Sequence, residues 1–344
     1  MPRFQPEELL AFVTDLVAAM GTSPEGSREV ADHLVKANLA GHDSHGVIRL
    51  KQYHTHIREG RINPAAEPLV SKDGPTTAVL DGNLAWGQVV ANQAVMLGIE
   101  KARKYSTAAI CVRHCYHVGR VGVYSLRAAK EGFIAQVHCN CHGVARVAPW
   151  GGVEPRLATN PIAVAIPTRT EPVLVDITTS VVAEGKVRVA RNAKKAIPEG
   201  WVNDKNGQPT TNPADLYEGG TILPLGGREG HKGYALSLLV DLLGGVLSGA
   251  GSGILTQDVG NGLFVQITDP AAFGDRDEIL DRVEEYLAYL RSSQTKEGVE
   301  KILLPGEPEL RTEAKRREEG IDIDEQTWSE VMEIAGELGV EFAN

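Results

Sequence analysis

The stretch AAICVRHCYHVGRVGVYSLRAAKEGFIAQVHCN, residues 108–140, contains two apolar runs with a helical pattern between them. AAICVRH (108–114) and FIAQVHCN (133–140) have the length and apolar content of buried strands. Between them, YSLRAAKEG (124–132) has a helical pattern that ends at a glycine. A strand, a helix and a second strand in this order are typical of an α/β sheet.

The same alternation continues on both sides of this stretch. We predict further strands at 76–82, 160–168, 172–180 and 263–268. We predict further helices at 6–20, 24–40, 45–59, 87–105, 181–193, 231–250 and 276–293. Residues 187–229 are rich in Gly, Pro, Asn and Thr, which indicates a long excursion over the surface. We therefore expect an α/β core with helical segments at both ends of the chain.

Composition excludes several classes of protein. The 344 residues carry a net charge of −10, which argues against a nucleic-acid-binding protein, because such a protein needs a basic face. No apolar stretch approaches the ~20 residues of a membrane span, and the N-terminal residues lack the apolar core of a secretory signal. All cysteines lie between residues 111 and 141, and we expect them to be free thiols in a reducing cytoplasm.

A first cluster of reactive side chains lies in GHDSHGVIRLKQY, residues 41–53. We expect Ser44 to cap a helix on which His45, Arg49 and Tyr53 share one face. A histidine shuttles protons near neutral pH, and an arginine fork holds a carboxylate through two parallel hydrogen bonds. The cluster therefore fits a carboxylate whose neighbouring carbon bears a reacting oxygen. The alternative is a solvated helix face with a serine cap.

A second cluster follows the strand at 108–114. His114 and His117 lie in the next turn, and Gly119 and Gly122 precede the helix. Polar groups at the carboxyl end of a strand in an α/β sheet are where ligands commonly bind. The histidines of this turn are therefore candidates for acid–base chemistry, and the alternative is that they are exposed to water.

The histidines and cysteines at 114–142 also raise the question of a metal site. Their C-x-C and H-x-x-H spacings differ from the C-x₂₋₄-C pairs typical of structural zinc, and H-E-x-x-H is absent from the sequence. We therefore expect no metal. A metal-dependent hydrolase or lyase that uses His114, His117, His138 and the cysteines is kept as the alternative function.

Two segments have features of phosphate- or ribose-binding sites. In VDITTS (175–180), Asp176 ends a strand and three hydroxyl side chains follow, although plain helix capping is the alternative. In GGREGHKGYAL (226–236), His231 and Lys232 follow glycines at the start of an apolar helix, which suits a phosphate or a developing alkoxide. No G-x-G-x-x-G follows a strand, so the sequence does not support a Rossmann dinucleotide site.

The motifs together resemble one known family. DSHGVIRLKQY, HVGRVGVY, ATNPIAVAIP, VDITTS and HKGYALSLLVDLLGGVLSGAG occur in this order, and the chain also contains GWVNDKNGQPTTNPADL and LPGEPE. Over about residues 6–340 the chain resembles the malate/L-lactate dehydrogenase family, which lacks the Rossmann fold. Members of that family include sulfolactate, ureidoglycolate and malate dehydrogenases, diketogulonate reductase and cyclic-imine reductases.

The resemblance implies an α/β, sulfolactate-dehydrogenase-like fold that binds NAD or NADP and packs helices from both chain ends together. It implies a helical N-terminal segment (1–75) that carries substrate residues, followed by an α/β cofactor-binding core (76–290). C-terminal helices (291–344) are expected to return and pack on the N-terminal segment. The resemblance also implies a homodimer, or a dimer of dimers, that shares the active site.

The family pattern also implies roles for individual residues. His117 of HxG is expected to donate and accept the proton, with His45 beside it. Ser44 and Arg49 are expected around the substrate carboxylate, and Tyr53 shares their predicted helix face. The residues expected near the cofactor are Cys141, Asp176, Ile177, Thr178, His231 and Lys232. Members often carry asparagine and serine where this chain has His114 and Cys115, and a serine near Cys141.

These expectations combine into one leading hypothesis. Hydride passes between nicotinamide C4 and C2 of a small 2-hydroxy or 2-oxo acid, such as malate, lactate, sulfolactate or a ureidoglycolate-like acid. His117 takes the hydroxyl proton on oxidation and returns it on reduction, while Arg49 orients the carboxylate. The metal-dependent enzyme is the second hypothesis. A non-catalytic ligand-binding protein on an enzyme scaffold is the third.

Overall fold

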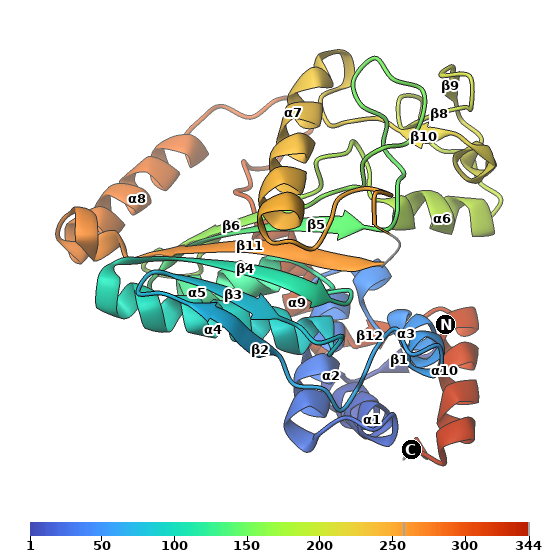
Figure 1. Ribbon diagram of the computed structural model, residues 1–344. Helices are drawn as coiled ribbons and strands as arrows, with labels where there is room; N and C mark the ends of the chain where they lie inside the picture. The colour runs from blue at the N-terminus through green and yellow to red at the C-terminus, as the bar shows by residue number, and fades with distance from the viewer. Residues whose placement is uncertain (257–258, 343–344) are drawn as a thin grey trace.

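The computed structural model describes residues 1–256 and 259–342, and its centre is a seven-stranded sheet (Figure 1). In spatial order the strands are β2 (Leu69–Asp73), β3 (Thr77–Asp81), β4 (Thr107–Cys115), β11 (Gly260–Thr268), β5 (Ile134–His142), β6 (Ile162–Ile166) and β7 (Val173–Ile177). β3 and β4 pair in parallel, and the other neighbours pair antiparallel. The expected α/β core is therefore confirmed.

The predicted strand–helix–strand unit forms β4, α5 (Gly122–Lys130) and β5. The two strands are not neighbours, because β11, from late in the chain, lies between them and pairs antiparallel with both. Alternate residues of β4, such as Ala108, Ile110 and Val112, are buried, as expected for a strand with one face on the core.

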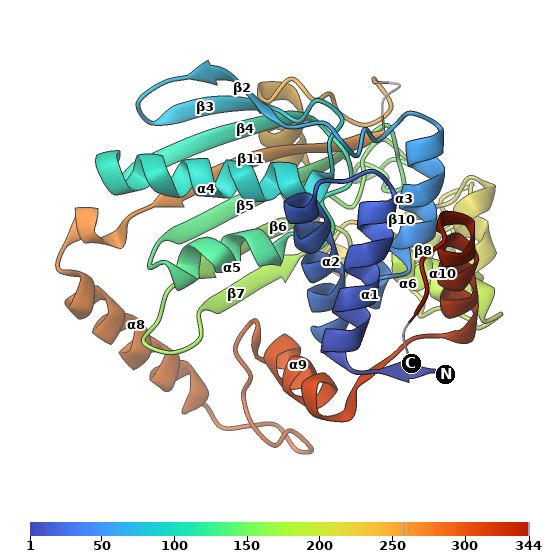
Figure 2. The same cartoon turned by 90° about the horizontal axis from the view of Figure 1, so that it is seen from below.

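Helices cover both faces of the sheet. α4 (Gly87–Tyr105) and α5 pack on one face, and α7 (His231–Val240) packs over β5 on the other (Figures 1 and 2). α8 (Arg276–Arg291) follows β11 at the edge of the molecule. In the described part of the chain, no helix combines the length and the apolar character that a membrane crossing requires.

The two ends of the chain pack together, as expected. β1 (Arg3–Phe4) pairs with β12 (Ile321–Asp322), and α10 (Glu325–Leu338) lies against α1 (Pro6–Ala19) and α3 (Arg49–Arg58). α9 (Glu307–Glu319) lies beside α2 (Pro24–Leu39), which places red and blue segments side by side in Figure 2. The aromatic rings that join the two ends are Phe4, Phe12, Trp328 and Phe342. The domain boundaries at residues 75 and 290 stay a prediction.

The helix predicted at 45–59 begins later than expected, at Arg49, and a single 3₁₀ turn, η1 (Asp43–His45), precedes it. Gly46 is extended, with φ −89° and ψ −151°, and separates the two pieces. The Asn38 side chain accepts a hydrogen bond from the Val47 amide at 3.0 Å and fills the space beside Gly46, which has no room for a Cβ atom. The expectation that Ser44 caps this helix was therefore wrong.

Two other predicted helices differ in their bounds. The helix predicted at 231–250 is α7 followed by a π-helical turn, η4 (Asp241–Leu247), and the helix predicted at 181–193 is α6 (Glu184–Asn192). Between α6 and α7 lie a small sheet and short 3₁₀ turns: β8 (Val202–Asn203), β9 (Pro209–Thr210), η2 (Pro213–Glu218), β10 (Thr221–Ile222) and η3 (Gly227–Glu229). A further 3₁₀ turn, η5 (Pro270–Phe273), follows β11.

Candidate active site

His117 lies in the loop between β4 and α5. Side chains of the N-terminal helices α2 and α3 contact this loop. Its Nδ1 atom is 2.8 Å from the hydroxyl oxygen of Tyr53, which comes from α3. The His45 ring stacks on the His117 ring with centroids 5.7 Å apart and planes at 11°. The structure therefore brings three predicted site residues together, although His45 reaches this position from η1 and not from a helix face.

Tight backbone packing holds the His117 loop in place. The main-chain amide of Arg120 donates to Nε2 of His33 at 2.9 Å, and a Cβ atom at Gly119 would overlap the His33 ring. Gly87, at the start of α4, lies against the His117 carbonyl and has no room for a Cβ atom. The loop is therefore positioned by α2 and α4 as well as by its own strand. Sequence reasoning missed His33, because nothing local distinguishes it from an ordinary helix residue.

A buried glutamine extends the contact between Tyr53 and His117. Nε2 of Gln88 donates to the Tyr53 hydroxyl at 2.9 Å. The other amide atom, Oε1, is buried and has no hydrogen-bond partner within the described residues. Burial raises the pKa of the Tyr53 hydroxyl far above its ordinary value, so the group remains protonated at neutral pH. Gln88 is a second residue that the sequence alone did not single out.

Arg49 lies at the start of α3 beside this cluster. Its Nε donates to the Ser44 carbonyl at 2.6 Å, and one terminal nitrogen donates to Gln52 Oε1 at 2.7 Å. Burial lowers its pKa, and no carboxylate of the described residues forms an ion pair with it. Arg49 is half-buried, and a guanidinium group that is partly removed from water is normally paired, so this arrangement is suited to an anion that comes from outside the chain.

Both histidines of the cluster are neutral at physiological pH. Burial is the main reason that the pKa values of His117 and His45 lie well below the ordinary value, and the nearby Arg49 charge lowers both further. Ser44 Oγ lies 3.1 Å from His45 Nδ1 and so contacts the ring directly. A neutral imidazole at this position can accept a proton from a bound hydroxyl group.

Asp176, expected near the cofactor, lies on β7 and is largely engaged within the protein. Its Oδ2 atom accepts from Arg120 Nε at 3.3 Å and from the Gly122 amide at 3.1 Å. Asp176 therefore ties β7 to the start of α5 and to the His117 loop. Its neighbour Ile177 is exposed, with 42% of its surface accessible.

The hydroxyls that follow Asp176 point to main-chain carbonyls. Thr178 Oγ1 donates to Ser180 O at 3.0 Å, Thr179 Oγ1 to Thr159 O at 3.1 Å, and Ser180 Oγ to Val182 O at 2.8 Å. The helix after them begins only at Glu184 and has no side-chain cap, so these residues do not cap it. They instead fix the course of the segment, which lies beside residues 223–225 through the Val181–Leu223 and Leu225–Thr179 hydrogen bonds.

His231 and Lys232 are exposed at the start of α7, directly after this neighbouring segment. The loop before them turns at Gly226 and Gly227, both with positive φ, and the Gly233 amide donates back to Leu225 O at 3.1 Å. The amides of His231 and Lys232 bond to no main-chain carbonyl among the described residues. Free amides at a helix start beside a basic side chain fit the phosphates of a dinucleotide.

Cys141 is linked to the π-helical turn η4 through a buried polar network. Its amide donates to Asn160 Oδ1 at 3.2 Å, and Asn160 Nδ2 donates to Asp241 Oδ2 at 2.9 Å. Asn261 Nδ2 donates to Cys141 Sγ at 3.3 Å, while Asn261 Oδ1 accepts from the Val118 amide at 2.9 Å. The network therefore connects the His117 loop to the sheet and to the π-helical turn that contains Asp241.

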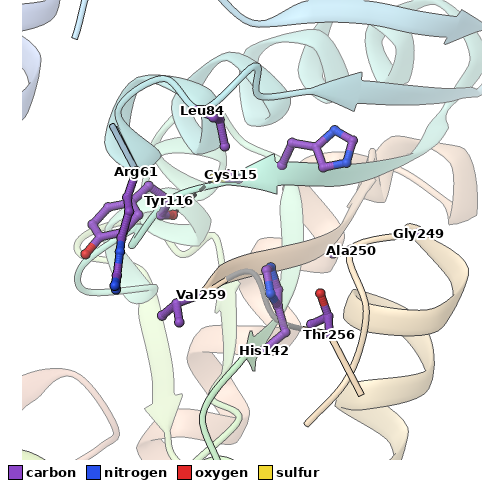
Figure 3. A pocket seen from close by; sticks show the side chains of 10 residues that line it. Arg61, Leu84, Cys115, Tyr116, His142, Gly249, Ala250, Thr256 and Val259 are labelled. Carbon is purple, nitrogen blue, oxygen red and sulfur yellow. Dashed lines mark hydrogen bonds between the residues drawn. The ribbon is translucent and has the colours of Figure 1, made fainter. Parts of the chain in front are cut away.

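His114, predicted beside His117, points elsewhere. Its Nδ1 lies 3.0 Å from both carboxylate oxygens of Asp81, and the ring is exposed. Together with His142 and Cys115, it lines a cavity of ≈ 140 Å³, and the residues that line this cavity include neither His45 nor His117. Figure 3 shows Cys115 and His142 at this cavity. Within the described residues, no three His, Cys, Asp or Glu side chains are grouped as metal ligands, so the hydrolase hypothesis has no ligand set there.

Comparison with known proteins agrees with the family resemblance that the sequence motifs indicate. Residues 4–332 match the sequence pattern of malate/L-lactate dehydrogenases. The chain belongs to the malate/L-lactate dehydrogenase family. A malate dehydrogenase of Pyrococcus abyssi is 39% identical to it over 98% of this chain and 95% of that protein. An L-sulfolactate dehydrogenase of Methanocaldococcus jannaschii is 37% identical over 98% of this chain and 97% of that protein.

Solved structures of the family agree with the fold. The crystal structure of malate dehydrogenase from Entamoeba histolytica covers 99% of each chain with a TM-score of 0.94 and 32% identity. This family member is therefore a 2-hydroxy acid dehydrogenase, and a nicotinamide cofactor is implied by the family. The hydrolase or lyase alternative receives no support from the comparisons.

Proposed function

We propose that the dehydrogenase binds its 2-hydroxy acid between Arg49 and His117, with the carboxylate on Arg49 and the C2 oxygen at His117 Nε2. One observation carries this placement. A half-buried arginine without an acidic partner among the described residues lies beside a half-buried histidine, whose pKa is well below its ordinary value and whose Nδ1 atom is 2.8 Å from the Tyr53 hydroxyl. Ser44 contributes its hydroxyl beside the ring of His45, which packs on His117.

Proton transfer follows from the hydrogen bonds of His117. On oxidation, the substrate hydroxyl proton passes to Nε2 of His117, and a bound nicotinamide would accept the C2 hydride. Nε2 can take this proton only in the tautomer that carries the hydrogen on Nδ1, so Nδ1–H donates to the Tyr53 oxygen before and after the transfer and stabilises the imidazolium. The Tyr53 hydroxyl then donates to the Gln88 side-chain oxygen when the amide group is turned so that Oε1 faces it. On reduction, the same groups return the proton.

For the cofactor, we propose that the first turn of α7 holds the phosphates of NAD or NADP through free amides, His231 and Lys232. We propose that Asp176, Ile177 and Thr178, at and just after the end of β7, also contact the cofactor. The chain that follows them is hydrogen-bonded to residues 223–225, which lead to α7. We place Cys141 near the cofactor as well, because its amide donates to Asn160 Oδ1, and Asn160 Nδ2 donates to the hydroxyl of Ser237 on α7. When bound, the nicotinamide supplies the hydride acceptor, and the residues above orient it.

We also propose that a second copy of the chain covers the outer face of α7 and η4. Large apolar side chains there are exposed, among them Leu239, Leu242, Val246 and Leu247 at 43%, 49%, 62% and 59%. A contiguous apolar surface of this kind is typical of a homodimer interface. A homodimer or a dimer of dimers would bury it. The four free thiols suit a cytoplasmic location.

The function is tested with purified protein and a panel of 2-hydroxy and 2-oxo acids, each with NAD(H) and NADP(H), followed by nicotinamide absorbance. We expect turnover of at least one acid that carries a carboxylate next to the reacting carbon, and loss of that turnover in His117→Ala. Full turnover in that variant would overturn the proposed placement.

A further inference from the structure

The first turn of α6 packs directly against the proposed substrate cluster. A Cβ atom added to Gly185 would lie 2.9 Å from the Ser44 Cβ, so the helix backbone and the Ser44 side chain are in close contact. Gly185 itself is buried, as is Val187. Arg188 stands three residues after Gly185, and residues at this spacing lie on the same side of a helix. We therefore infer that Arg188 lies on the side of α6 that faces Ser44.

Electrostatics agree with this placement. The charge of Arg188 contributes to the lowered pKa of His117 and also lowers the pKa of Arg49. The charges of the two guanidinium groups, from α3 and from α6, therefore oppose one another. Like charges repel most strongly where the surroundings are poorly hydrated, and Arg49 is half-buried.

No side chain of α6 among the described residues forms an ion pair with Arg188. Glu184, one turn earlier, accepts the Tyr217 hydroxyl at 2.6 Å, and the Arg191 guanidinium stacks over the same ring at 3.9 Å. The Glu184 charge acts favourably on Arg49. Among the described residues, however, no carboxylate lies within ion-pair distance of Arg188 or Arg49.

We propose that Arg188 binds a second anionic group, a carboxylate or sulfonate, of a 2-hydroxy acid whose first carboxylate is held by Arg49. This inference rests on the proposed placement of the substrate. A ligand with one anionic group at each guanidinium removes the repulsion between them and forms charge-assisted hydrogen bonds at both ends. Arg188 thereby selects acids with two anionic groups over those with an uncharged tail.

The test measures kcat/KM of Arg188→Gln for three acids that differ only beyond C2: malate with a carboxylate, sulfolactate with a sulfonate, and lactate with a methyl group. Loss of one charge-assisted contact predicts a fall of about tenfold to a hundredfold for the acids with two anionic groups. The fall for lactate should stay below about threefold. The malate and sulfolactate arms show which of the two groups the native enzyme prefers.

Two further variants separate a binding role from a structural one. Arg191→Gln removes a guanidinium from the same helix, and its selectivity between malate and lactate should equal that of the native enzyme. Arg188→Lys keeps the charge and should recover part of the malate activity. Equal losses for malate and lactate in Arg188→Gln, or a selectivity change of the same size in Arg191→Gln, would overturn the inference.

Cofactor phosphate is the competing ligand for Arg188. The dissociation constants of NADH and NADPH, measured by protein fluorescence, should be unchanged in Arg188→Gln, and a marked weakening would overturn the inference. Arg49→Gln tests the underlying site separately. If it reduces turnover of all three acids while Arg188→Gln changes none, the proposed site stands and this inference fails. If Arg49→Gln changes none, the proposed site itself fails.

Discussion

The hydroxyl oxygen of Tyr53 lies 2.8 Å from Nδ1 of His117, although the two residues are 64 positions apart. This contact joins the helical N-terminal segment to the end of a central strand. It also leaves Nε2 as the ring atom available for a substrate oxygen. The structure thus determines which nitrogen of His117 can take part in proton transfer, and the predictions below depend on that geometry.

The Tyr53 hydroxyl is expected to matter for turnover more than for folding. Tyr53→Phe keeps the ring against Trp86 but removes the partner of Nδ1. Because a hydrogen bond to a charged group contributes about 1.5–3 kcal/mol, kcat should fall about tenfold to a hundredfold. The dissociation constant of NAD(P)H should not change. Steady-state kinetics and a thermal melt measure the two effects.

A matched control for Tyr53→Phe is Tyr124→Phe. Tyr124 is also buried and donates to the neighbouring Val118 carbonyl at 2.5 Å, so its loss disturbs the same loop without removing a contact to the His117 ring. Tyr53→Phe should lower kcat much more than Tyr124→Phe. Equal losses in the two variants would mean that loop packing, and not the Nδ1 contact, is responsible.

Removal of the His117 ring should abolish acid–base catalysis. His117→Ala is expected to lower kcat by about 10²–10⁴, the usual contribution of a positioned acid–base group. His114→Ala is the control, because this exposed histidine contacts Asp81 and lies outside the cluster. Its kcat should remain within about twofold of the native value. Comparable kcat values for the two variants would remove His117 from the mechanism.

The geometry of Arg49, and not only its charge, should be required. Arg49→Lys keeps a cation but loses the planar fork and the contacts to Ser44 O and Gln52 Oε1. We expect kcat/KM to fall at least about tenfold. Arg61→Lys, on an exposed arginine beside Glu59, should be neutral. An amide analogue of the substrate is expected to be poor for the native enzyme and little worse for Arg49→Lys. A similar loss for acid and amide would place Arg49 in a purely structural role.

Buried histidines should make the fold less stable in acid. Burial lowers the pKa of His33 from 6.5 to about 3, so the unfolded chain binds a proton that the folded chain does not. The His33 contribution is fully present above about pH 6.5 and is lost as the pH falls from 6.5 toward 3, at about 1.4 kcal/mol per pH unit. Urea unfolding at pH 7.5, 6.5, 5.5 and 4.5 measures it.

His33→Gln tests the assignment of this pH dependence. The glutamine oxygen can still accept the Arg120 amide, but it does not titrate. Between pH 6.5 and 4.5, the stability of the variant should depend on pH less steeply than that of the native protein, by about one proton. Parallel curves for the two proteins would show that His33 is not responsible.

Local patterns in the sequence predicted six of the seven strands of the central sheet and most helices, but not the edge strand β2. The alternation at β4 and β5 and the glycines of the His117 loop are visible without any tertiary information. These patterns identified His117, Arg49 and Tyr53 as candidate site residues, because each lies in or beside a strand or helix that the sequence predicts. Local patterns did not predict the break at Gly46, because the side chain that fills the space belongs to Asn38 on another helix.

Only the tertiary structure decided the strand order and the full composition of the site. β11 pairs with β4 and β5 across more than a hundred residues, and no local pattern encodes such a pairing. Gln88 and His33 act through partners 35 and 87 positions away, and the backbone of α6 at Gly185 packs against Ser44 from a distant part of the chain. Hydrophobic periodicity reports how each segment meets the core, whereas a contact between distant side chains exists only after the segments have packed.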